Sequence, residues 1–195
     1  MFLLGVLGLA LLIAVVMLAY AGTTGQAGSG VGAGSTQGPS ARQALDVALA
    51  TAEQRMADAR LVGVSRQWFE VGVPQQDPGE WTYQFYSPST QKLLVVAVAQ
   101  GEGRVVRGPS LSPYRLETFS EELWLVDSDL AWGAWWENGG DSMVTQRPDT
   151  DVLMQLRLVG EDESRLLWLV SGILGEDTSF TVWVDAVSGE VMFAE

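Results

Sequence analysis

The C-terminal stretch, residues 165–195, constrains the fold of this chain more than any other. Two runs rich in β-branched and aromatic residues, 166–171 and 179–184, are separated by a short acidic connection. This composition favours two antiparallel strands joined by a turn. Ser188-Gly189 then provides a turn in which glycine can adopt positive φ, and 191–193 can return as a short extension. We therefore predict a C-terminal antiparallel hairpin.

The preceding residues predict the same kind of unit twice. Ser40 is a suitable N-cap for a helix whose apolar residues recur at spacings of three and four up to Ala59. Asp127 or Ser128 can cap a second helix that ends near Trp136. The expected strands are 60–71, 81–85 and 93–99 after the first helix, and 152–159 and the C-terminal hairpin after the second. This order predicts an α+β fold of two tandem helix-plus-antiparallel-sheet modules.

A residue-level echo supports a tandem repeat. Val96-x-Val98 followed by Gly103-x-Val105 has the same spacing as Val182-x-Val184 followed by Gly189-x-Val191. The two patterns are offset by about 86 residues, and a fixed offset of this kind is typical of repeated units. We expect residues 40–108 to form the first module and residues 109–195 the second.

The N-terminal residues predict a membrane segment and a tether. Residues 2–20 are almost wholly apolar, and at ~1.5 Å per residue they come close to the ~30 Å thickness of the bilayer core. Cleavage after Ala19-Tyr20-Ala21 is the alternative, but the run exceeds the usual h-region of 7–15 residues and no basic residue precedes it. We expect residues 1–21 to be a single-pass cell-membrane anchor with the C-terminal region outside the cytoplasm. The alternative is that the protein is secreted after cleavage near Ala21. Residues 22–39, rich in Gly and Ser, are expected to be a flexible tether.

The composition excludes several classes of function. The chain has no cysteine and no histidine, which removes thiolate chemistry, the Ser-His dyad and the commonest metal ligands. The net charge of −13 disfavours binding to nucleic acids. Asp149, Asp151 and the acidic run 161–163 lack the spacing of a calcium loop, so solvated turns are the simpler interpretation. We predict no enzymatic activity, no cofactor and no bound metal.

The tryptophans are the main candidates for binding. Trp132, Trp135 and Trp136 share one helical face, which favours packing in the core over stacking on a glycan. Trp183 points to the side of its strand opposite Val182 and Val184. If those valines face a helix, Trp183 lies on the outer face, where it could contact a partner or be covered by the other module.

The C-terminal pattern resembles the PepSY-like family of cystatin-like α+β modules. The matching residues are Trp168, Asp185, Ala186, Gly189, Glu190 and Val191. The first module resembles a degenerate copy, because Trp81-x-Tyr83-x-Phe85 fits but Ala99-Gln100 stands where Asp-Ala is expected. We expect Asp185 to accept hydrogen bonds from turn amides before Gly189. The resemblance implies a non-catalytic cell-envelope module, linked in some members to peptidase inhibition or propeptides.

These observations together predict a membrane-anchored, extracytoplasmic binding module. Its expected partner is an envelope protein, with a peptidase among the candidates. A module that binds a glycan or small ligand through exposed tryptophans is the alternative.

Overall fold

The computed structural model describes residues 38–72, 79–160, 163–175 and 178–195. The expected membrane segment, residues 1–21, and nearly all of the expected tether lie outside this part of the chain. Within the described residues, no helix combines the length and the apolar character needed to cross a bilayer.

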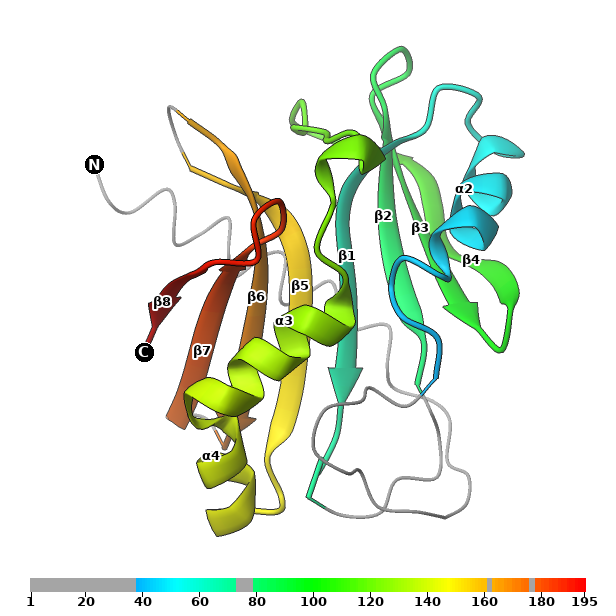
Figure 1. The fold of residues 1–195 in the computed structure, drawn as a ribbon. Coiled ribbons are helices and arrows are strands. Elements are labelled where there is room, and N and C mark those ends of the chain that lie inside the picture. Colours follow the sequence, from blue (N-terminus) through cyan, green and yellow to red (C-terminus); the bar gives the residue numbers. More distant parts are fainter. Residues whose placement is uncertain (1–37, 73–78, 161–162, 176–177) are drawn as a thin grey trace.

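The fold is α+β and is built on one antiparallel sheet of eight strands in the described residues (Figure 1). The strands lie in the order β4-β3-β2-β1-β5-β6-β7-β8. Each half is therefore a four-stranded meander preceded by a helix, and the halves join where β1 pairs with β5. The strands are β1 (Arg60–Trp68), β2 (Trp81–Ser87), β3 (Lys92–Ala99), β4 (Glu102–Leu111), β5 (Asp151–Val159), β6 (Arg165–Leu174), β7 (Thr178–Asp185) and β8 (Val191–Ala194).

The helices cover one face of this sheet. In Figure 1, α2 lies beside β3 and β4, whereas α3 crosses in front of β6 and β7, and contacts between the same elements agree. The helical segments are α2 (Leu45–Glu53), the 3₁₀ turn η1 (Glu121–Leu123), α3 (Ser128–Trp135), the π turn η2 (Trp136–Gly140) and α4 (Asp141–Gln146). We call the opposite side, which no described helix covers, the helix-free face.

The first helix is shorter than the sequence predicts. It begins at Leu45, after a turn at residues 41–44 whose first amides bond to the other half of the chain. The amide of Ala41 donates to Ser128 Oγ at 3.0 Å, and the amide of Arg42 donates to Asp127 Oδ1 at 3.1 Å. Ser40 nevertheless makes the hydrogen bonds of the predicted N-cap, because its Oγ accepts from the amide of Gln43 at 3.3 Å and its own amide donates to Gln43 Oε1 at 3.1 Å. The second helix agrees with the prediction, since Asp127 caps α3 by accepting from the amide of Ser128.

Strand β4 and helix α4 were not predicted. β4 contains two glycines and Pro109 and is largely exposed at the edge of the sheet, so it lacks the apolar alternation of a half-buried strand. It continues to Leu111, past the boundary expected at residue 108. β1 ends at Trp68 rather than residue 71, because Glu70 takes the left-handed backbone conformation.

Aromatic side chains fill the core between the helices and the sheet. Trp132 and Trp135 are almost completely buried, and Trp136 is partly buried, which confirms the core interpretation of this stripe. The ring of Trp132 lies 5.1 Å from that of Trp68, so a helix of the second half packs on a strand of the first. Further ring contacts of 5.9, 6.2 and 5.8 Å run in sequence through Trp68, Trp81, Trp168 and Trp124.

Candidate binding surface

The residues that carry the family resemblance begin with a turn at the end of β7. Asp185 Oδ1 accepts from the amides of Val187 and Ser188 at 2.8 and 2.9 Å. The amide of Gly189, which has φ of +80°, donates to the carbonyl of Asp185. Partial burial tends to raise the pKa of Asp185, but the hydrogen bonds from Ser188 and Val187 outweigh it and lower the pKa below 3.8. The predicted capping role of Asp185 is confirmed.

Ala186 and Trp168 hydrogen-bond the segment just before α3 and so hold the start of this helix against the sheet. The carbonyl of the fully buried Ala186 accepts from the amides of Leu125 and Val126 at 2.9 and 2.8 Å. The indole N–H of Trp168 donates to the carbonyl of Val126 at 2.8 Å, and the next residue, Asp127, caps α3. Trp168, Asp185 and Ala186 therefore support the fold, whereas Gly189, Glu190 and Val191 lie at the surface.

The first half closes the equivalent hairpin differently. β3 and β4 are joined by Gln100 and Gly101, which have φ of +52° and +80°. Positive φ at both central residues is the signature of a tight two-residue hairpin turn. Such a turn is too short to supply the additional loop amides that an aspartate would bind. This accounts for Ala99-Gln100 in place of the Asp-Ala pair.

Trp183 lies on the helix-free face, as its position opposite Val182 and Val184 predicts. Both valines are buried in the core, while Trp183 is partly buried. Trp183 pairs with Phe193 of β8, and the two rings meet edge to face at 6.3 Å. The two halves share one sheet, so the other half does not stack on Trp183.

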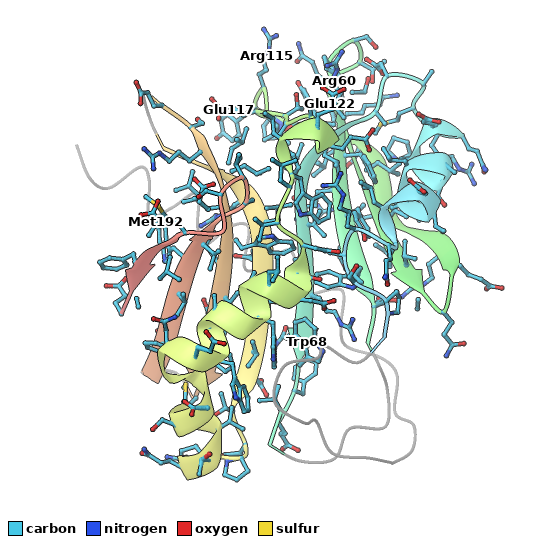
Figure 2. All side chains as sticks on the ribbon, in the orientation of Figure 1. Arg60, Trp68, Arg115, Glu117, Glu122 and Met192 are labelled. Atoms are coloured by element: carbon cyan, nitrogen blue, oxygen red, sulfur yellow. The ribbon has the colours of Figure 1, made fainter. Side chains whose placement is uncertain are left out.

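Strand β8 forms one edge of the sheet and exposes apolar side chains. Val191, Met192 and Phe193 have exposed fractions of 37%, 40% and 49%. Thr181 and Glu195 exchange both backbone hydrogen bonds, at 2.7 and 3.0 Å. Because backbone groups alternate in direction along an antiparallel strand, the N–H and C=O of Ala194 point away from β7. Figure 2 labels Met192 on this outer strand.

The sequence did not single out Met192 and Phe193 as candidates. The available signal was a short apolar run after the Ser188-Gly189 turn, but a sequence does not show that the strand would be the last in its sheet.

The acidic segments form structural contacts where they are described. Asp149 pairs with Arg147 at 3.4 Å, and Asp151 accepts from the amide of Glu70 at 2.9 Å. Among the described residues, no group of three acidic side chains could hold a metal ion. Part of the run 161–163 lies outside the described residues.

Comparisons with models of known families, with curated proteins and with solved structures found no match to this chain. The PepSY-like resemblance, carried by Trp168 and the turn from Asp185 to Val191, therefore stays a prediction.

Proposed function

We propose that this protein is a non-catalytic, membrane-anchored module that binds and modulates an extracytoplasmic envelope protein. A peptidase is one candidate partner, through the PepSY-like resemblance alone. The anchor is assigned to residues 1–21 on their apolar sequence.

The exposed edge of β8 is the observation that supports this proposal. Its outward N–H and C=O groups can pair with an extended segment of a partner, which adds a strand to the sheet. Met192 and Phe193 next to these groups would add apolar contacts, and the ring of Trp183 packs edge to face against that of Phe193.

The alternative, glycan or small-ligand binding through exposed tryptophans, has less support. Trp132 and Trp135 are buried, and Trp183 is only partly accessible. Stacking on a sugar needs an open aromatic face, so we rank this function second.

We also propose that the two halves are repeats of one ancestral module. Helix and four-stranded meander occur in the same order in both halves. The echoed valines lie on equivalent strands, since Val96 and Val98 belong to β3 and Val182 and Val184 to β7. Trp81 and Trp168 likewise lie on the second strand of each half.

Site-specific crosslinking in native membranes tests the function. The full chain would carry a photoreactive residue in place of Met192, alone or combined with Ala194→Pro or Ala194→Val. Proline removes the outward N–H but is tolerated at a sheet edge, whereas valine keeps the N–H. We expect one defined envelope-protein adduct that Ala194→Val retains and Ala194→Pro reduces by about tenfold or more, the effect of losing roughly 1.4 kcal/mol of binding.

Equal adduct formation by both variants would contradict strand addition. No adduct in any variant would contradict the binding-module function itself. Circular dichroism of each variant checks that the fold is retained.

A further inference from the structure

A cavity of about 190 Å³ lies against the helix-free face where the two halves meet. The central strands β2, β1 and β5 form its floor. Leu116 and Glu117, from the segment between β4 and η1, line its rim. Figure 2 labels Glu117 at the end of the sheet where β1 begins. Val62 and Leu158 add apolar surface.

The strand register collects polar groups on this floor. Gly63 of β1 pairs with Gln84 of β2 on one side and with Arg157 of β5 on the other. Ser65 pairs with Gln155 in the next position on the same face. Because Gly63 has no side chain, it leaves space between an amide and a guanidinium.

Arg157 is a cation without a counter-ion in the described part of the chain. Its Nε is buried and has no hydrogen-bond partner, and neither the ion pair of Arg104 with Glu80 nor that of Arg147 with Asp149 involves it. Burial lowers the pKa of Arg157, although a guanidinium stays charged at neutral pH. Arg157 is partly buried, and a cation that is partly removed from water is stabilised by pairing with an anion.

We propose that this cavity binds a carboxylate, either of a short aliphatic acid or of a peptide C-terminus. The two terminal nitrogens of Arg157 would donate to the two carboxylate oxygens side by side. The amides of Gln84 and Gln155 and the hydroxyl of Ser65 would supply further donors.

The charges and size of the cavity favour a small monoanion over phosphate. Arg157 is the one cation among the described lining residues, and Glu117 at the rim would repel a second negative charge. Glu117 itself accepts from Ser164 Oγ at 2.9 Å rather than pairing with Arg157. The cavity is smaller than the roughly 300–1,000 Å³ of pockets for drug-sized ligands, so it suits a terminal group with a short aliphatic chain along Val62 and Leu158.

NMR of the arginine Nε–H signals tests this proposal on the detergent-solubilised full chain. The probes are butyrate, acetyl-Ala-Val with a free C-terminus, its C-terminal amide, and phosphate. We expect the Arg157 signal to shift with both carboxylates and not with the amide or phosphate. Tighter binding of butyrate than of the peptide would support a free acid as ligand, and the reverse order would support a peptide C-terminus.

Three variants separate binding from folding. Arg157→Met should weaken carboxylate binding by at least about tenfold. Arg107→Met is the matched control, because Arg107 is an exposed arginine on outer strand β4. Gly63→Ala should weaken butyrate binding, since a Cβ there would enter the cavity and meet only the carbonyl of Leu156, at 3.3 Å.

The proposal is overturned if the Arg157 signal does not move, if phosphate shifts it equally, or if Arg157→Met binds carboxylates as the parent does. The cavity is separate from the β8 edge, so these results leave the crosslinking test unaffected.

Discussion

At the scale of single residues, Asp58 fastens the end of the α2–β1 connection to the β2–β3 turn. Its Oδ1 accepts from Ser87 Oγ at 2.6 Å and its Oδ2 accepts from the amide of Ser89 at 2.9 Å. The bond from Ser87, followed by those from Ser89, lowers the pKa of Asp58 from 3.8 to about 2. The ionised carboxylate is thus the form that the fold stabilises.

A pH-dependent loss of stability follows. Because the folded pKa lies below the unfolded one, Asp58 contributes stability above pH 3.8 that disappears as the pH falls towards 2. Asp58→Asn should therefore lower the melting temperature near neutral pH, and the difference from the parent should vanish near pH 2. Thermal unfolding at several pH values measures this, and a difference that stays constant with pH would contradict it.

Residue roles were predictable where they depend on neighbours in the chain. The bonds to Asp185 and the outward direction of Trp183 follow from turn chemistry and strand alternation. The partnerless Arg157 was not predictable, since its surroundings come from Gly63 and Gln84 on distant strands. One residue of slip in either pairing would place other side chains there.

At the scale of elements, the close approach of the helical layer to β6 depends on Gly172. A Cβ at this position would lie 2.7 Å from Met143 Sδ and 2.8 Å from Trp135 Cζ2. Both distances are shorter than van der Waals contact, so either α4 or the buried Trp135 would have to move.

Gly172→Ala should destabilise the protein by about 1–3 kcal/mol because of this overpacking. Gly133→Ala is the matched control in α3, where a Cβ meets no atom within 4 Å. It should be neutral or stabilise by up to about 1 kcal/mol, since alanine favours a helix interior. Chemical denaturation measures both, and equal effects of the two variants would contradict this account of the packing.

Elements were predictable where their caps or their buried positions leave a pattern in the sequence. α3 and the strands of the C-terminal hairpin have a cap or an apolar alternation that is visible in the sequence. β4 has neither, because an exposed edge strand places no apolar requirement on alternate residues. The bonds from the amides of Ala41 and Arg42 to the distant Ser128 and Asp127 were not predictable either, because no local pattern indicates them.

At the scale of the whole molecule, the two halves are joined by both backbone and core. β1 and β5 pair from Gly63 opposite Arg157 to Trp68 opposite Val152. The ring contact between Trp68 and Trp132 adds a link through the aromatic core. The tandem order seen in the sequence is present, but a continuous sheet connects its two parts.

Calorimetry of the full chain should therefore show one unfolding transition, with equal calorimetric and van't Hoff enthalpies. Unfolding one half would expose the β1 or β5 edge and open the shared core, so neither half should melt alone. Two separated transitions would contradict this coupling and favour independent modules. The same experiment on Gly172→Ala should shift the whole transition rather than split it.

The two borders of the sheet differ in a way that limits assembly. β4 carries Pro109, which has no N–H, and its pairing with β3 contains register shifts, both features that discourage docking of another strand. β8 has neither. If a partner strand adds to β8, the opposite border is still the proline-containing β4, so we expect further strands not to add there and the complex not to propagate into a fibre.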